Sequence, residues 1–253
     1  MDCLLLRGLG RESEHWGGFP QRMAAVLAPG AVHTLDLPGM GANHRETSPL
    51  SVAAIRARLQ ARAAKCQEPL LLVGLSMGGM VALDWARQAP GQIAGVVTIN
   101  TSSGLNPPWQ RLHWQQWSTV LELMGRGPSL QREAGILALT SNRPAPAGLL
   151  DDWRRFQQQR PVTRRNVLRQ LLAASRYRPA ATPPAAPVLL LSSRGDRLVS
   201  SQCSRTLSRR WDCPLREHGT AGHDLPLDDP EWVLHEIRQW LTGHHLTRHG
   251  TDA

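Results

Sequence analysis

Three residue types that together activate a serine hydroxyl occur in this chain, each just past a predicted strand. Ser76 lies in Gly-Leu-Ser-Met-Gly (residues 74–78), after an apolar run and before a helical pattern. Asp196 ends the segment 189–196, and His223 ends the segment 219–223. A serine becomes nucleophilic when a histidine removes its proton and a carboxylate orients that histidine. The three residues predict acyl-transfer chemistry, with Ser76 as nucleophile, His223 as base and Asp196 as its orienting acid.

The glycines around Ser76 indicate a sharp turn between a strand and a helix. A strained turn residue needs neighbours without side chains two positions away, and Gly74 and Gly78 occupy those positions. The turn would hold the hydroxyl clear of the backbone, above the N-terminus of the helix. The N–H of Met77 would then face the negative charge that develops on a substrate oxygen.

Each of these residues also has a purely structural explanation: a helix cap, a turn aspartate and a solvated loop histidine. Their chain order and their positions after predicted strands favour the triad. The alternative place for the acid, after the preceding strand, reads Asn-Thr-Ser-Ser (residues 100–103) and holds no carboxylate, which favours Asp196. Asp224, Asp228 and Asp229 are interpreted as loop or helix N-terminal charges.

Strand and helix patterns alternate along most of the chain. Strands are expected at 3–7, 31–35, 70–74, 94–100, 188–192 and 215–218, and helices at 15–28, 51–66, 77–88, 201–211 and 230–241, with Ser48 or Ser51 as the cap of the second helix. This alternation predicts an α/β fold with a mostly parallel sheet of about six strands and helices on both faces. The carboxyl ends of such strands share one edge, where ligands bind.

Between residues 104 and 186 the alternation stops. The segment contains arginine- and glutamine-rich helical patterns broken by prolines, and it is too long for an unstructured loop. It separates two parts of the predicted core, 1–103 and 187–253. Residues 179–187 are rich in proline and predict a stiff return linker.

The same segment carries most of the charge. It has 12 arginines against 4 acidic residues, whereas the whole chain has a formal net charge of +9. Arginines such as Arg154 and Arg155 suggest an acidic partner or substrate, for example an acyl carrier protein; a solvated basic face is the plainer explanation. No nucleic-acid motif accompanies the charge. Trp109 and Trp114 either pack the helices or line an acyl pocket.

The motifs together resemble the α/β-hydrolase superfamily, and within it the small carboxylesterases with a cap, which include pimeloyl-carrier-protein methyl ester esterases and related menaquinone-pathway lyases. The resemblance rests on residues 7–10, 36–41, 74–78, 195–196 and 222–223. It implies that 104–186 is a helical cap, that the fold's two leading antiparallel strands are missing, and that Leu9 supplies the second oxyanion N–H. The family usually has His-Gly where this chain has Arg7-Gly8, which leaves the neighbouring side-chain contacts open.

Composition excludes several other classes. No apolar run approaches the roughly 20 residues that span a bilayer, and no signal peptide precedes the first strand, so a cytoplasmic protein is expected. The four cysteines lack metal-binding spacing and are expected to be free thiols. No metal, cofactor or phosphate-binding loop is expected.

A serine carboxylesterase acting on a small ester or thioester is the function that these features favour. Two alternatives stay open: a lyase that uses the triad only to move a proton, and a binding protein that keeps the fold without turnover. A dehalogenase is disfavoured because the elbow holds serine rather than a carboxylate.

Overall fold

Six parallel strands form the centre of the molecule. The computed structural model describes residues 1–63, 66–127 and 129–244. The strands are β1 (Cys3–Leu6), β2 (Val32–Leu35), β3 (Leu70–Leu75), β4 (Ile93–Ile99), β5 (Val188–Ser193) and β6 (Leu215–His218), in the order β2-β1-β3-β4-β5-β6. All five pairings are parallel, and no antiparallel strand occurs in the described residues. The predicted fold class is confirmed.

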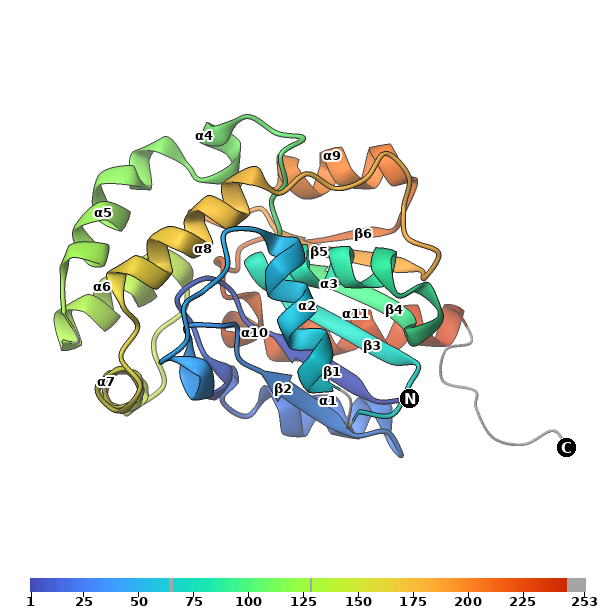
Figure 1. The fold of residues 1–253 in the computed structure, drawn as a ribbon, viewed down its shortest axis with the longest axis horizontal. Coiled ribbons are helices and arrows are strands. Elements are labelled where there is room, and N and C mark those ends of the chain that lie inside the picture. The colour runs from blue at the N-terminus through green and yellow to red at the C-terminus, as the bar shows by residue number, and fades with distance from the viewer. Residues whose placement is uncertain (64–65, 128, 245–253) are drawn as a thin grey trace, which may run out of the picture.

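Helices cover both faces of this sheet (Figure 1). The core helices are α1 (Phe19–Leu27), α2 (Val52–Arg62), α3 (Met77–Gln88), α9 (Gln202–Trp211), α10 (Leu225–Asp228) and α11 (Pro230–Gly243). Alternate residues of β1 show the two layers, because side chains along a strand point to opposite faces. Leu4 and Leu6 pack with α2, α3 and α9, whereas Cys3 and Leu5 pack with α1 and α11.

Two predicted helices differ from the structure. The helix expected at 15–28 is a short 3-10 helix, Ser13–Trp16, followed by α1, because Gly17 has a φ of 53° that breaks a right-handed helix. The helix α2 ends at Arg62 instead of Cys66, and residues 64–65 of the predicted span lie outside the described residues. Its cap is Ser51, whose hydroxyl accepts from the Ala54 N–H at 3.2 Å.

The segment 104–186, called the insertion from here on, lies between β4 and β5. It contains α4 (Pro108–Arg111), the 3-10 helix Trp114–Gln116, α5 (Trp117–Gly125), α6 (Leu130–Thr140), α7 (Leu149–Gln159) and α8 (Arg164–Arg176). These helices gather at one side of the sheet, on the left in Figure 1. No helix among the described residues is both long and apolar enough to cross a membrane. The four cysteines are free thiols, as predicted.

Candidate active site

Ser76 lies in a strained turn between β3 and α3. Its φ of 55° is unusual for a residue with a side chain, and it is paired with a ψ of −117°. A Cβ on Gly74 would lie 2.4 Å from the backbone of Gly78, and a Cβ on Gly78 would lie 2.1 Å from the Leu6 carbonyl oxygen. Both positions therefore require glycine, and the turn brings the serine to the carboxyl end of β3.

His223 and Asp196 meet at the ends of neighbouring strands. His223 follows β6, Asp196 follows β5, and the His223 Nδ1 lies 2.7 Å from the Asp196 Oδ2. The other oxygen, Oδ1, accepts from the backbone N–H groups of Leu198 at 2.8 Å and Val199 at 3.0 Å. Both side chains are buried, so the carboxylate has a fixed orientation toward the imidazole.

Burial of the imidazole lowers the pKa of His223, but the negative charge and hydrogen bond of Asp196 and the charge of Asp224 raise it by more. The net result is a pKa above its ordinary value of 6.5. This electrostatic environment suits a group that accepts a proton and stays charged for part of a reaction.

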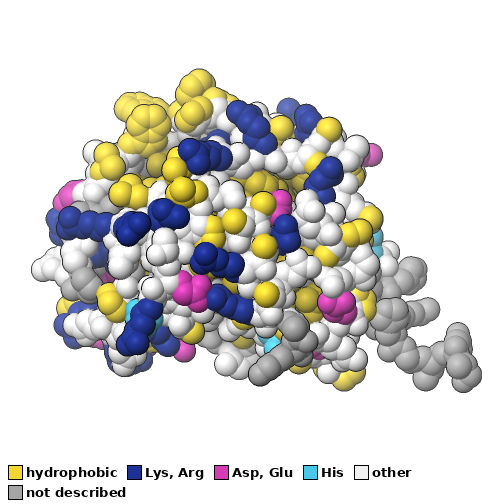
Figure 2. Space-filling model, viewed as in Figure 1, with side chains coloured by type: hydrophobic (Ala, Val, Ile, Leu, Met, Phe, Trp, Pro, Cys, Tyr) yellow, Lys and Arg dark blue, Asp and Glu magenta, His cyan; other side chains and the backbone are white. Residues whose placement is uncertain are grey.

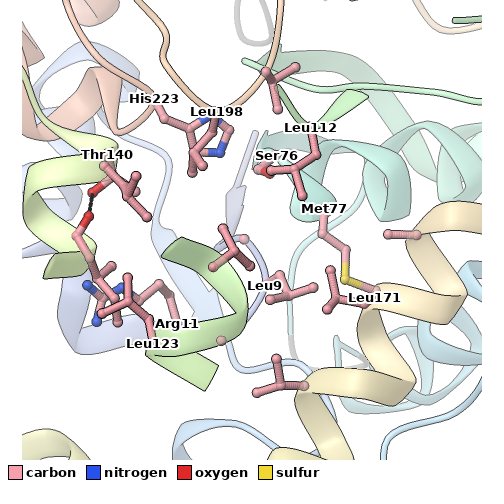
Figure 3. A pocket seen from close by; sticks show the side chains of 18 of the residues that line it. Leu9, Arg11, Ser76, Met77, Leu112, Leu123, Thr140, Leu171, Leu198 and His223 are labelled. Atoms are coloured by element: carbon pink, nitrogen blue, oxygen red, sulfur yellow. Dashed lines mark hydrogen bonds between the residues drawn. The ribbon is translucent and has the colours of Figure 1, made fainter. Parts of the chain in front are cut away.

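A cavity joins these residues to the insertion. Its volume is about 260 Å³, and Ser76 and His223 both line it (Figure 3). The His223 ring faces Ser76 across the cavity, with no hydrogen bond between the two side chains among the described residues. Such contacts often tighten only when substrate binds. Most of the other lining side chains are apolar, and they come from both the core and the insertion: Leu9, Met77, Leu112, Leu123, Ile136 and Leu171.

The two predicted oxyanion residues lie beside Ser76. Met77 begins α3, and Leu9 lies in the loop after β1, where Figure 3 shows it on the same wall of the cavity. A Cβ on Gly8 would lie 3.1 Å from the Ser76 Cβ, so this loop passes directly against Ser76.

Asn100 positions the histidine loop, a role that was not predicted from the sequence. It follows β4 with a φ of 47°, and its Nδ2 donates to the His223 carbonyl oxygen at 2.9 Å. Its Oδ1 accepts from the Ser193 N–H at 2.8 Å, which links the histidine loop to the end of β5. Asparagine at a strand end is a weak signal, although this residue tolerates the left-handed conformation better than most.

Asp224 occupies the N-cap position of α10, in agreement with the predicted helix N-terminal charge, but its side chain makes no capping hydrogen bond. Its carboxylate accepts instead from both terminal guanidinium nitrogens of Arg7, at 3.1 and 2.5 Å. Arg7 also lies over the Trp16 ring at 4.7 Å, and both ions are buried. This pair joins the loop of Leu9 to the loop of His223. The arginine that departs from the family pattern thus has a defined partner. Asp229 matches the prediction, because its side chain caps α11.

The four substrate-binding candidates in the insertion lie elsewhere. Trp109 and Trp114 are 57% and 64% exposed and do not line the cavity. Arg154 and Arg155 pair with the aspartates three residues earlier on α7, and Arg155 lines a separate cleft beside Phe156. None of the four lines the cavity beside Ser76, and a contact of these residues with substrate stays a prediction. The described residues contain no group of three or more metal-binding side chains.

The chain belongs to the alpha/beta hydrolase family, whose model matches residues 3–236. It is 28% identical over 245 residues to the pimeloyl-[acyl-carrier protein] methyl ester esterase of Aromatoleum aromaticum, covering 91% of this chain and 94% of that protein. The enzyme of the same name from Edwardsiella ictaluri is 34% identical over 101 residues, covering 40% of this chain and 36% of that protein.

Solved structures share the fold at lower identity. A thermophilic esterase from Thermogutta terrifontis superposes with a TM-score of 0.73 at 19% identity, covering 97% of this chain and 90% of the other. A bacterial membrane phospholipase A superposes with a TM-score of 0.75 at 22% identity, covering 96% of this chain and 79% of the other. With the named relatives, the family match supports a hydrolase of the carboxylesterase kind.

Proposed function

We propose that the chain is a serine carboxylesterase that works through an acyl-enzyme, with Ser76, His223 and Asp196 as its triad. The observation that carries the proposal is the His223 ring, held by Asp196 at 2.7 Å and facing a serine in a strained elbow. The apolar cavity beside Ser76 supports an apolar acyl group as substrate.

In this mechanism the free Nε2 of His223 takes the Ser76 proton while Oγ bonds to the ester carbonyl carbon. The carbonyl electron pair moves to its oxygen, where the N–H groups of Leu9 and Met77 stabilise the charge. Collapse of the intermediate expels the alcohol, which takes the proton from His223. Water then repeats both steps on the acyl-enzyme and releases the acid and the free serine.

The insertion is proposed to be a helical cap, with residues 1–103 and 187–253 as the core. Its helices contribute apolar side chains to the cavity, including Val120 and Val167. A cap in this position would exclude water from the acyl chain and select its length.

An acidic acyl carrier is the partner that the outer face of the cap fits best. The stretches 108–126 and 164–178 carry seven arginines and one acidic residue, Glu122. Arg111, Arg126 and Arg164 line the cavity, whereas Arg165, Arg176 and Arg178 are exposed and do not line it. Exposed apolar side chains lie among them, notably Leu121 and Leu168. Figure 2 shows such yellow side chains gathered where Figure 1 places α4 and α5, with dark-blue ones beside them. The first relative's name mentions a carrier-linked ester, which agrees with this charge pattern.

The first test is hydrolysis of p-nitrophenyl esters of increasing acyl length by the wild type and by Ser76→Ala. We expect turnover that depends on Ser76 and covalent capture of Ser76 by a slowly released acyl group. A folded wild type without turnover on any ester would contradict the proposal. Proton-transfer activity that depends on Ser76 without covalent capture would favour the lyase instead.

A second experiment tests the carrier. Arg165→Glu with Arg176→Glu reverses two exposed charges on α8. We expect a KM at least tenfold higher for an acyl-carrier ester and an unchanged KM for a small neutral ester. Arg154→Glu with Arg155→Glu on α7 is the matched control. Equal effects of the two double variants would contradict an α8 docking face.

A further inference from the structure

The loop that carries Leu9 contains no regular structure of its own. Residues 7–12 lie between the end of β1 and the 3-10 helix that starts at Ser13. The position of a backbone donor in such a loop depends on the contacts that hold the loop in place. The Arg7–Asp224 ion pair and the contact of Gly8 with Ser76 hold the loop on one side of Leu9. The contacts of the residues after Leu9 hold it on the other side.

Arg11 attaches this loop to two helices of the insertion. Its Nη1 donates to the Glu133 Oε2 on α6 at 2.7 Å, and its guanidinium lies 4.0 Å above the Trp153 ring on α7. Arg11 is 8% exposed and Glu133 is fully buried. The other Glu133 oxygen accepts from Arg132 at 2.6 Å. Since separation would remove one of the two arginine partners of a fully buried carboxylate, this ion pair resists displacement of the loop.

The neighbours of Arg11 make contacts of the same kind. The Gly10 N–H donates to the Gln170 Oε1 on α8 at 3.4 Å, and the Glu12 carboxylate lies 2.5 Å from the Arg160 guanidinium after α7. Gln170 also donates to the Pro38 carbonyl oxygen at 3.2 Å, which anchors it to the core. Three consecutive residues after Leu9 thus contact the insertion through buried or half-buried polar groups.

We propose that Arg11 and Glu133 are positioning residues of the oxyanion hole: through this ion pair the insertion holds the Leu9 N–H against Ser76. The proposal rests on the esterase function proposed above. It gives the insertion a part in turnover beyond covering the substrate. The rival explanation is that the ion pair stabilises the fold only, and the experiment must separate the two.

The test compares an oxygen ester with its thiono counterpart, p-nitrophenyl butyrate with C=O or C=S, using Glu133→Gln. N–H donors in an oxyanion hole stabilise charge on oxygen better than on sulfur, which is a weak hydrogen-bond acceptor. A misplaced donor therefore slows the oxygen ester selectively, whereas a smaller folded fraction slows both substrates equally. Glu231→Gln is the control, because this glutamate forms an exposed ion pair with Arg22.

We expect Glu133→Gln to lower kcat for the oxygen ester by about 10- to 100-fold, less than complete loss of a donor. KM should stay within about threefold, and the thiono ester should slow by less than about threefold, since neither depends mainly on the donor. Parallel losses on both esters, or an unchanged kcat, would overturn the proposal.

If Glu133→Gln does not fold, Arg11→Met with Arg132→Met and Glu133→Leu replaces it, because this triple variant removes all three charges of the cluster together. The same selective loss on the oxygen ester is expected. Failure of this variant to fold would assign the pair to folding and refute the positioning role. Failure of the esterase proposal is distinct, because the wild type would then hydrolyse neither ester.

Discussion

Replacing Asp196 by asparagine tests the triad without changing its shape. The Asp196 Oδ1 accepts from two backbone N–H groups, at 2.8 and 3.0 Å, and the variant's amide oxygen must take that place because an NH2 group there would face two donors. The amide nitrogen is therefore directed at the His223 Nδ1, which lies 2.7 Å from the carboxylate oxygen in the wild type.

This orientation places the imidazole proton on the wrong nitrogen. An amide NH2 donates to Nδ1, so the proton of the neutral ring moves to Nε2 and no lone pair remains to accept the Ser76 proton. The same substitution in a serine protease triad lowers kcat about 10⁴-fold, which corresponds to roughly 5 kcal/mol in the activation free energy. We expect a loss of this size for Asp196→Asn.

The assay is kcat for p-nitrophenyl butyrate at pH 8, with circular dichroism to confirm that the variant is folded. Asp212→Asn is the matched control, because this exposed aspartate at the end of α9 has a φ of 49° that asparagine tolerates. The control should retain wild-type kcat. A folded Asp196→Asn variant with kcat within tenfold of the wild type would refute the assigned role of Asp196.

The same geometry makes four further predictions. Because the pKa of His223 is raised above 6.5, the acid limb of kcat/KM should have its midpoint above pH 6.5; a lower midpoint would contradict His223 as the base. The raised pKa also means that protonated His223 stabilises the fold below pH 6.5 and that this stabilisation is lost as pH rises through the folded-state pKa. The free energy of unfolding in urea, measured at several pH values, should show this decrease in the wild type and not in His223→Gln. Gly74→Ala forces a Cβ to within 2.4 Å of backbone atoms, so its free energy of unfolding in urea should fall by about 1–3 kcal/mol or more. Asn100→Gly keeps the positive φ but removes the side-chain hydrogen bonds to the histidine loop. Its free energy of unfolding in urea should be lower than that of the wild type by about 1–3 kcal/mol. An unchanged free energy of unfolding would show that those hydrogen bonds contribute little.

The elements were predicted with most success where a local pattern is sufficient. The β6 bounds, 215–218, and the end of α3 at Gln88 agree with the prediction, because the apolar period and the turn residues that define them are neighbours in the sequence. The 3-10 helix before α1 was missed because a Gly-Gly pair inside an otherwise helical pattern leaves the backbone two choices. In the conformation that the backbone adopts, the Trp16 ring stacks on the Phe19 ring.

By itself, the sequence determined the elbow and the placement of the three site residues at strand ends. The requirement for Gly74 is steric and local, because its Cβ would meet the backbone of Gly78, whereas Gly78 must be glycine because the end of β1 packs against it. Parallel strands bring their carboxyl ends to one edge. Only the tertiary structure decided which polar groups meet across that edge. Arg7 and Asp224 are 217 residues apart, and Arg11 and Glu133 are 122 apart. It also decided that Trp109 and Trp114 lie outside the cavity, because the face a helix buries depends on what it packs against, and no local pattern contains that information.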